Sequence, residues 1–453
     1  MPSTKLFGTD GVRGQANSGV MTVENALQIG RAVGLLCKRT HPRVRVMIGK
    51  DTRRSGYLFE HALLAGLCSV GAEPYLVGVL PTPGIAYMTH SMRADAGVVI
   101  SASHNPFQDN GIKIFGHDGF KLPDEMEARI EQLVAYPAPL HAGLAQGGDI
   151  GRAYRVDDAW GRYVVQLKNT FPGDLTLDGL KIAVDCGNGA AYRVAPAVFE
   201  ELGAIVVKVG VDPDGININD GVGALHPQHL AKIVVEQQCD FGLALDGDAD
   251  RLILIDEKGQ PVDGDRVMGL CALRMKAAGT LGHNTLVATV MSNFGLEIAM
   301  RDAGITLLRT DVGDRQVVDA MRKGGFTLGG EQSGHLVFLD HATTGDGTLA
   351  ALQVAAIAVR EGKRISELAQ MMQNVPQLLI NLPVREKPPI ATLAGVVTTI
   401  GEAERELAGF GRVLVRYSGT ERKCRVMVEG SDEALVHSHA KRIADAVVQA
   451  IGV

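Results

Sequence analysis

Residues 181–209 read KIAVDCGNGAAYRVAPAVFEELGAIVVKV, and this stretch contains the pattern that decides the fold. An apolar run ends at a glycine-rich turn, a helix-like stretch follows over 194–204, and a second apolar run completes the unit. The same order of strand, turn and helix begins near residue 44 and recurs over 285–308. Continuous apolar strands that alternate with helices are typical of parallel sheets covered on both faces. We therefore predict three similar α/β domains with mainly parallel sheets.

The last segment has a different pattern. Two strand-like runs over 412–430 are joined by a polar turn, and a helix is expected from about Asp432 to Val448. This pattern predicts a small α+β domain. A chain of 453 residues is too long for one hydrophobic core and should divide into several domains. We expect these domains to cover residues 1–155, 156–257, 258–372 and 373–453.

Composition excludes several classes of function. The net charge of -6 and the absence of a Lys/Arg run argue against a nucleic-acid partner. The first residues hold no apolar leader-like run, and no apolar stretch has the length of a membrane span. The six cysteines are scattered without a CxxC pair, which disfavours a zinc ribbon or a thioredoxin-type site. A soluble protein in the reducing cytoplasm, without a membrane partner, is the expectation.

Residues 246–251 read DGDADR and lie between the apolar runs FGLAL and LILID. The spacing of Asp246, Asp248 and Asp250 can point all three carboxylates to one side. Carboxylates about 5 Å apart repel by roughly 3 kcal/mol per pair at an effective dielectric of about 20, so a cation is expected among them. Because every ligand is an oxygen, Mg²⁺ fits better than Zn²⁺. A solvated acidic turn is the alternative, and the flanking buried strands disfavour it.

Ser103 lies in SASHNP (101–106), directly after the apolar run AGVVI. One interpretation is an N-cap or turn serine, which is common in this context. The chain has no Gly-x-Ser-x-Gly elbow, which disfavours an α/β-hydrolase, and no GxxxxGK[ST] loop, which disfavours ATP bound by a P-loop. A serine that carries a phosphoryl group is the other interpretation. Its phosphate would supply the oxygen that Mg²⁺ at the three aspartates needs.

Four further stretches contain groups suited to phosphate or sugar. RYSGTER (416–422) offers Arg416, Ser418, Gly419 and Thr420, with Arg425 on the next strand. GGEQSGH (329–335) gathers a carboxylate, an amide, a hydroxyl and His335 among glycines. FGTDGVRG (7–14) adds Arg13, and NGIK (110–113) adds Lys113. Taken alone, RYSGTER is equally an ordinary polar hairpin and GGEQSGH an ordinary loop.

Two other patterns are interpreted as structural. Gly187 and Gly189 begin a dinucleotide-like fingerprint, but Tyr192 stands where its third glycine should be, so a tight strand-to-helix turn is favoured. KLPDEMEARIEQL (121–133) predicts an amphipathic helix, and its acidic residues should be solvated.

Together, GTDGVRG, SASHNP with NGIK, DGDADR, GGEQSGH and RYSGTE resemble the α-D-phosphohexomutase superfamily. They follow the family's order from Gly8 to Arg425, so the resemblance covers nearly the whole chain. GTDGVRG, SASHNP and EQSGH are most similar to the bacterial phosphoglucosamine mutase branch. One position departs from the family, which commonly has proline where Arg422 stands. Whether Arg422 assists phosphate binding or lies outside the site stays open.

The resemblance implies a four-domain enzyme whose cleft takes one loop from each domain, with a TATA-binding-protein-like fourth domain. It implies that Ser103 is a phosphoserine and joins the three aspartates around Mg²⁺. It further implies proton transfer by Lys113 and His335, and steadying of the transferred phosphoryl group by Arg13 and Arg251. The remaining roles would fall to sugar-binding Glu331 and Ser333, and to phosphate-binding Arg416, Ser418, Gly419, Thr420 and Arg425.

The implied activity is the interconversion of glucosamine 6-phosphate and glucosamine 1-phosphate through phospho-Ser103 and a 1,6-bisphosphate. Such an isomerase of amino-sugar metabolism, on the route to UDP-N-acetylglucosamine, would need Mg²⁺ and glucosamine or glucose 1,6-bisphosphate as activator. The resemblance also implies a homodimer, and either a kinase or autophosphorylation to charge Ser103. Three rivals stay open at this point: a mutase for glucose or mannose phosphate, a Mg²⁺-dependent sugar phosphatase, and a non-catalytic sugar-phosphate sensor.

Overall fold

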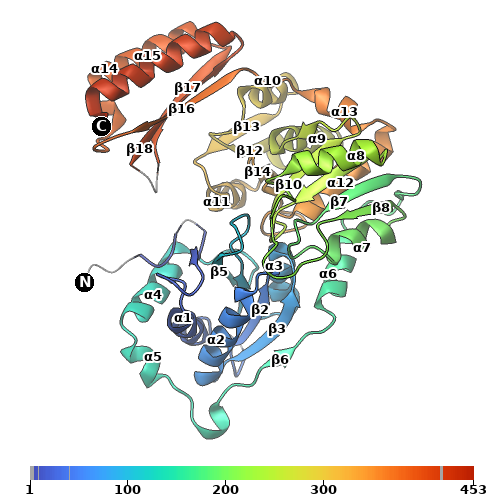
Figure 1. The fold of residues 1–453 in the computed structure, drawn as a ribbon, viewed down its shortest axis with the longest axis vertical. Helices are drawn as coiled ribbons and strands as arrows, with labels where there is room; N and C mark the ends of the chain where they lie inside the picture. The colour runs from blue at the N-terminus through green and yellow to red at the C-terminus, as the bar shows by residue number, and fades with distance from the viewer. Residues whose placement is uncertain (1–4, 9, 40, 419–421) are drawn as a thin grey trace.

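The computed structural model describes residues 5–8, 10–39, 41–418 and 422–453. The chain forms four sheet-centred units in sequence order, which follow one another from blue to red in Figure 1. The first unit has a six-stranded sheet of order β1-β5-β4-β2-β3-β6. Its strands are β1 (Val12–Gln15), β2 (Arg45–Lys50), β3 (Glu73–Val79), β4 (Ala96–Ile100), β5 (Asp109–Gly116) and β6 (Tyr154–Arg155). Its helices are α1 (Val23–Leu36), α2 (Ser55–Ser69), α3 (Thr82–Ser91), α4 (Asp124–Ala135) and α5 (Ala138–Ala142).

The second and third units repeat the α/β pattern with smaller sheets, of order β11-β10-β9-β7-β8 and β13-β12-β14-β15. After α6 (Ala159–Lys168), the second contains β7 (Lys181–Asp185), α7 (Val194–Glu201), β8 (Ile205–Val209), α8 (Pro227–Glu236), β9 (Phe241–Leu245), β10 (Leu252–Asp256) and β11 (Pro261–Val262). The third contains α9 (Gly264–Ala277), β12 (Thr285–Thr289), α10 (Phe294–Asp302), β13 (Thr306–Thr310), α11 (Asp314–Gly324), β14 (Leu328–Gly330), β15 (Leu336–Phe338), α12 (Gly347–Glu361) and α13 (Ile365–Leu368).

The fourth unit is α+β. Its three strands are all antiparallel, in the order β16-β18-β17, and two helices cover one face of the sheet (Figure 1). The elements are β16 (Gln377–Pro383), α14 (Ala394–Glu406), β17 (Gly411–Tyr417), β18 (Lys423–Gly430) and α15 (Glu433–Ile451). Three α/β units and one α+β unit confirm the predicted fold class. The domain boundaries near 155, 257 and 372 stay predictions.

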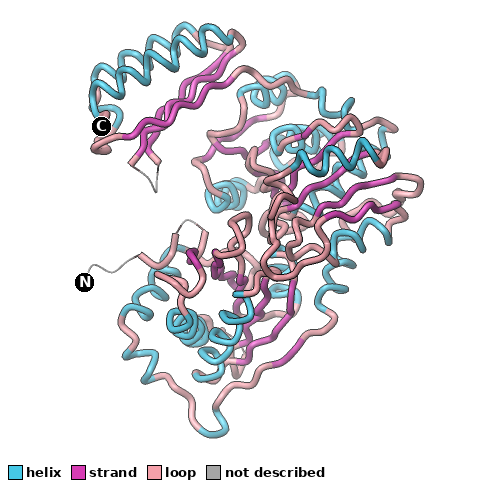
Figure 2. The backbone as a smooth tube through the Cα atoms, viewed as in Figure 1, coloured by secondary structure: helices cyan, strands magenta, loops and turns pink. Residues whose placement is uncertain are grey.

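The candidate loops share one position in the sheets. Within the α/β sheets the pairs β2–β4, β7–β9 and β12–β14 are parallel, as predicted. In contrast, the strands on either side of each candidate loop are antiparallel: β4–β5, β9–β10, β14–β15 and β17–β18. SASHNP, DGDADR, EQSGH and RYSGTER are therefore the connections of four antiparallel pairs. Figure 2 shows loop segments gathered where the first three units meet.

The cores explain how the units hold together. One continuous buried cluster runs from α3 and β3 through the second sheet to α9 and α12, and so joins the first three units. A second cluster fills the opposite face of the first sheet, beneath α1, α2 and α4. The fourth unit has its own core between its sheet and α14 and α15. Among the described residues, no helix is both long and apolar enough to cross a membrane.

Candidate active site at the junction of the units

Ser103 occupies a loop whose backbone is held tightly. Its φ is 51°, in the left-handed region that non-glycine residues seldom adopt, and its side chain is 1% exposed. Its carbonyl accepts hydrogen bonds from Arg53 Nη2 at 2.8 Å and from Asn219 Nδ2 at 3.0 Å. Arg53 is fully buried and also donates to the carbonyls of Asn105 and Pro106 and to the Asp51 carboxylate. The first and second units therefore fix the SASHNP loop together.

The seryl hydroxyl points at the predicted metal loop. Ser103 Oγ donates to Asp246 Oδ2 at 2.6 Å. Asp246, Asp248 and Asp250 are all buried, and one carboxylate oxygen from each lies within 4.8 Å of the others. Burial and the neighbouring carboxylates raise the pKa of Asp246 well above its usual range. Burial alone would also raise the pKa of Asp248, but the Lys113 ammonium and the Thr82 hydroxyl outweigh it and hold that pKa below its usual range.

The donor set of this cluster fits a hard divalent cation. Asp248 Oδ1 and Asp250 Oδ1 are buried and have no hydrogen-bond partner among the described residues. Unpartnered buried carboxylate oxygens are strongly unfavourable unless a cation coordinates them. All potential ligands are oxygens, which suits Mg²⁺. The Gly187 turn contacts the metal loop, because Ala190 N–H donates to the Gly247 carbonyl at 2.8 Å. The CGNGA sequence is thus a tight structural turn, as predicted.

Lys113 lies at the centre of the charges. Its side chain is buried, and its ammonium lies 2.9 Å from Asp248 Oδ2, 3.4 Å from Asp250 Oδ2 and 3.3 Å from Asp10 Oδ2. Burial would lower the pKa of Lys113, but these three carboxylates together raise it far above its usual range. Arg13 pairs with Asp10, and Arg251 Nε lies 3.9 Å from Asp250 Oδ1. The structure therefore brings together the four motifs of the first two units, namely FGTDGVRG, SASHNP, NGIK and DGDADR.

The predicted sugar loop meets this cluster from the third unit. His335 pairs through its backbone with Arg251 in an isolated antiparallel bridge, and its Nε2 accepts a hydrogen bond from Gly345 N–H at 3.3 Å. Glu331 Oε1 accepts a hydrogen bond from Gly313 N–H at 3.1 Å. Ser333 is exposed at the tip of the loop. EQSGH therefore lies next to the metal loop, which its own sequence could not establish.

The fourth loop belongs to the separate α+β unit. Arg416 and Arg425 lie directly opposite one another on β17 and β18. Burial and the Arg425 charge lower the pKa of Arg416, as expected where two cations share a site suited to an anion. Arg416 Nη2 lies 3.7 Å from Met291 Sδ, and the Ser418 carbonyl accepts a hydrogen bond from Lys387 Nζ at 2.6 Å. Gly419 and Thr420 lie outside the described residues.

The structure also shows residues that sequence reasoning missed. Arg53 and Asn219 hold the serine loop, while Asp10, Lys121 and Asp314 form an ionic row between the first and third units. The DTR sequence at 51–53 follows a buried strand, and this position could have drawn attention to Arg53. The expectation that the acids of 121–133 are solvated is wrong for Glu127, which is buried against Arg315 at 2.7 Å. Burial raises the pKa of Glu127 to about 7.

Comparison with known proteins assigns the chain to a family. It matches phosphoglucomutase/phosphomannomutase α/β/α domain I over residues 4–138, domain II over 161–259, domain III over 263–375 and the C-terminal domain over 379–446. A phosphoglucosamine mutase of Geotalea daltonii is 58% identical over 99% of this chain and 98% of its own length. One of Myxococcus xanthus is 57% identical over 100% and 98%.

Solved structures agree on the fold. A phosphoglucomutase/phosphomannomutase family protein of Burkholderia thailandensis superposes with a TM-score of 0.81, 24% identity and complete coverage of both chains. An Aspergillus fumigatus N-acetylphosphoglucosamine mutase, solved with GlcNAc-6P and magnesium, gives a TM-score of 0.66 at 18% identity over 99% of this chain and 96% of its own. The chain therefore belongs to the phosphoglucomutase/phosphomannomutase family and, within it, to the phosphoglucosamine mutases.

Proposed function

We propose that this isomerase converts glucosamine 6-phosphate to glucosamine 1-phosphate reversibly through phospho-Ser103. The observation that carries the proposal is the hydrogen bond of 2.6 Å from Ser103 Oγ to Asp246 within a buried cluster of three aspartates. A turn or N-cap serine has no need of that cluster. A phosphoserine needs a neutralising cation and positioned positive charge, because phosphoryl transfer depends mainly on positioning and electrostatic stabilisation.

The proposed reaction has two balanced transfers. In the first, the phosphorus–oxygen bond at Ser103 breaks, a new bond forms to O1 of the sugar, and a 1,6-bisphosphate results. The proton of O1 passes to the His335 imidazole, and Lys113 returns a proton to the seryl oxygen. After the bisphosphate turns round in the cleft, its 6-phosphate returns to Ser103 by the reverse chemistry. Glucosamine 1-phosphate leaves, and no ATP is consumed.

The other residues bind and orient. Asp246, Asp248, Asp250 and the Ser103 side chain would hold Mg²⁺, which when bound neutralises the negative charge that develops on the phosphoryl oxygens. Arg13 and Arg251 steady the transferring phosphoryl group. Glu331 and Ser333 hold the sugar. Arg416, Ser418, Gly419, Thr420 and Arg425 hold the phosphate that is not transferred.

Four properties complete the proposal. A sugar 1,6-bisphosphate, of glucosamine or glucose, acts as activator because it can recharge a dephosphorylated Ser103. The first charge comes from a kinase or from autophosphorylation. The enzyme works in the cytoplasm, a location that the six free cysteines support, and it forms a homodimer. Intact mass before and after phosphatase treatment would report the charge on Ser103.

The experiment is a phosphorus NMR assay with Mg²⁺, a trace of sugar 1,6-bisphosphate and, separately, the 6-phosphates of glucosamine, glucose and mannose. We expect glucosamine 1-phosphate to form preferentially without free phosphate. Preferential turnover of glucose or mannose phosphate would keep the relay and change the substrate. Free phosphate alone would replace the mutase with a phosphatase.

The Ser103→Ala variant tests the relay itself. We expect it to lose turnover while it keeps the wild-type circular dichroism spectrum and thermal midpoint, because only the phosphate acceptor is removed. Retained isomerisation in this variant would contradict a phosphoserine intermediate.

A further inference from the structure

A row of alternating charges connects the two groups proposed to transfer protons. Lys113 Nζ lies 3.3 Å from one oxygen of Asp10, and the other oxygen of Asp10 pairs with Lys121. Lys121 also pairs with Asp314, and Asp314 Oδ2 lies 3.7 Å from His335 Nε2. Neither Lys121 nor Asp314 belongs to the motifs that carry the proposed chemistry.

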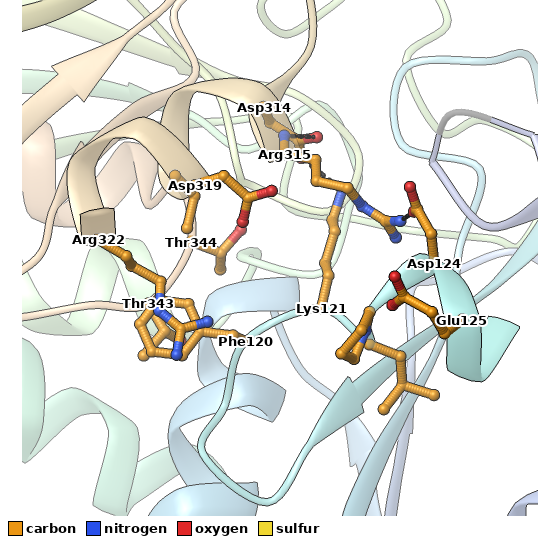
Figure 3. Close-up of a pocket in the computed structure, with 13 residues that line it drawn as sticks. Phe120, Lys121, Asp124, Glu125, Asp314, Arg315, Asp319, Arg322, Thr343 and Thr344 are labelled. Carbon is orange, nitrogen blue, oxygen red and sulfur yellow. Dashed lines mark hydrogen bonds and ion pairs between the residues drawn. The ribbon is translucent and has the colours of Figure 1, made fainter. Parts of the chain in front are cut away.

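This row crosses from the first unit to the third. Lys121 lies in the loop between β5 and α4, and Asp314 is the first residue of α11. The Lys121 side chain is 13% exposed and that of Asp314 is 17% exposed, so both charges are largely removed from water. Figure 3 shows Lys121 reaching from its loop toward Asp314 and Arg315. Desolvated charges of this kind hold a fixed geometry only while every partner is present.

The start of α11 also touches the proposed sugar loop twice. Gly313 N–H donates to Glu331 Oε1 at 3.1 Å, and the carboxylate of Asp314 faces His335. A displacement of Gly313 and Asp314 would therefore shift both the sugar-binding carboxylate and the imidazole. The Lys121 ammonium pairs with both Asp314 and Asp10, and Asp10 in turn contacts Lys113.

A matched contact lies a short distance away on the same boundary. A cavity of about 200 Å³ lies between residues 120–125, which lead into α4, and α11, and Lys121 forms part of its wall. On another wall the Arg322 guanidinium stacks on the Phe120 ring, 4.0 Å from its centre (Figure 3). Arg322 also lies 3.6 Å from Asp118. Arg322 therefore also joins the third unit to the first, but it contacts neither Asp10 nor the 331–335 loop in these interactions.

We propose that Lys121 and Asp314 are positioning residues of the mutase reaction. They hold the sugar loop of the third unit at the distance from Lys113 and Ser103 that the reaction requires. This inference rests on the proposed function. Lys121 acts through Asp10 and Asp314, and Asp314 acts through His335 and the Gly313 backbone. The pair places the reacting groups and does not itself touch the phosphoryl group.

The test compares Lys121→Met and Asp314→Asn with Arg322→Met as the matched control, in the full chain with Mg²⁺, glucose 1,6-bisphosphate and glucosamine 6-phosphate. Misplacement of about 1 Å can lower a rate by about 10²-fold, and we expect kcat to fall by that order in the first two variants. KM should rise by a smaller factor than kcat falls, because Glu331 shifts with the loop while the groups proposed to bind the substrate's phosphate are intact. Lys121→Arg, which keeps the charge, should recover part of kcat, and Arg322→Met should keep the wild-type kcat.

The double variant Lys121→Met/Asp314→Asn distinguishes positioning from general weakening of the boundary. Residues that act as a unit are non-additive, so the double variant should be no slower than the slower single variant. Wild-type kcat in Lys121→Met, a multiplicative loss in the double variant, or an equal loss in Arg322→Met would overturn the proposal. Thermal midpoints identify any variant that fails to fold, in which case Lys121→Arg and Asp314→Asn decide. If the wild-type protein does not isomerise glucosamine 6-phosphate, the result contradicts the proposed function itself.

Discussion

Arg53 shows at the residue scale how the backbone of the serine loop is stabilised. Its guanidinium donates to the carbonyls of Ser103, Asn105 and Pro106 and to Asp51, all within a fully buried space. A planar fork with fixed donor directions can satisfy four acceptors that surround it, whereas an ammonium is a point charge on a flexible stem. The left-handed backbone at Ser103, with φ of 51°, depends on these bonds.

Arg53→Lys should therefore slow the loading of Ser103 while it leaves the protein folded. We expect phosphorylation from glucose 1,6-bisphosphate to slow by roughly 10²-fold, the effect typical of an ångström-scale displacement of a reacting group. Intact mass against time measures this rate. Arg53→Met is the matched comparison: it leaves Asp51 as an unpaired buried charge and should also destabilise the protein by about 3–5 kcal/mol. If Ser103 of Arg53→Lys is phosphorylated at the wild-type rate, the serine loop does not need the guanidinium group.

The three aspartates lead to a second prediction at this scale, with a readout other than activity. A ligand that binds only the folded state stabilises it, by about 2.7 kcal/mol at 100 times Kd. MgCl₂ should therefore raise the thermal midpoint of the wild type, and Asp250→Asn should reduce this increase because it removes the buried charge of one proposed metal ligand. NaCl at equal ionic strength is the control. An equal increase in the thermal midpoints of the wild type and Asp250→Asn would show that Mg²⁺ binds away from the three aspartates.

Sequence reasoning at the residue scale found the groups that lie inside contiguous motifs and missed those that act across space. Ser103, Lys113 and the aspartates could be selected as candidates because each lies in a short motif whose residue types suggest its chemistry, and the structure brings these residues together. The partners of Arg53 and Lys121 could not be predicted, because Ser103 and Asp314 lie 50 and 193 residues away from them in the chain. Glu127 was interpreted as solvated for the same reason: Arg315, its partner, comes from the third unit.

At the scale of elements, the candidate loops are connections between antiparallel strands on otherwise parallel sheets. The apolar runs before SASHNP and DGDADR predicted buried strands, and β4 and β9 are buried throughout. Periodicity does not report direction, however, because parallel and antiparallel strands that are buried on both faces give the same apolar run. The hairpin geometry that brings polar tips to one edge therefore had to come from the structure.

The junction of α9 and α10 gives a prediction about pH. Asp265 in α9 is buried and its Oδ2 accepts a hydrogen bond from Asn293 N–H at 2.8 Å, at the N-cap of α10. Burial raises the pKa of Asp265 to about 7. In the unfolded chain an aspartate has a pKa of about 3.9, so between these values the folded protein holds a proton that the unfolded chain has released. The free energy of unfolding therefore falls as pH rises through this window.

Asp265→Asn removes this dependence and keeps an oxygen that can accept the Asn293 hydrogen bond. The wild type should lose stability relative to this variant between about pH 4 and about pH 7, by an amount on the order of 2–4 kcal/mol at most. Thermal midpoints of both proteins, measured in parallel at each pH, give the difference and cancel the titration of all other groups. A constant difference would show that Asp265 does not bind a proton in this range.

At the scale of the whole molecule, three units share one core and the fourth has its own. The connection between them is short. The Asn293 side chain donates to the Val375 carbonyl at 3.1 Å and accepts from Val375 N–H at 3.0 Å, so the chain is held at 375 just before β16 begins. Arg412 adds a contact from β17 to the carbonyls of Val290 and Ser292. The fourth unit thus rests on the third through a few polar contacts, which favours rotation about this connection.

A substrate that spans the units should therefore draw the fourth unit toward Ser103. In the proposed function, its transferred end lies at Ser103 in the first unit and its other phosphate at Arg416 and Arg425 in the fourth. We expect limited proteolysis of residues 370–378 in Ser103→Ala to slow when glucose 1,6-bisphosphate is added, because this variant binds the ligand without reacting. Adding Arg416→Met to this variant should abolish the ligand effect and leave cleavage without ligand unchanged. Equal protection with and without the bisphosphate would contradict a hinge at this connection, and would require the sugar to reorient in a cleft of fixed width.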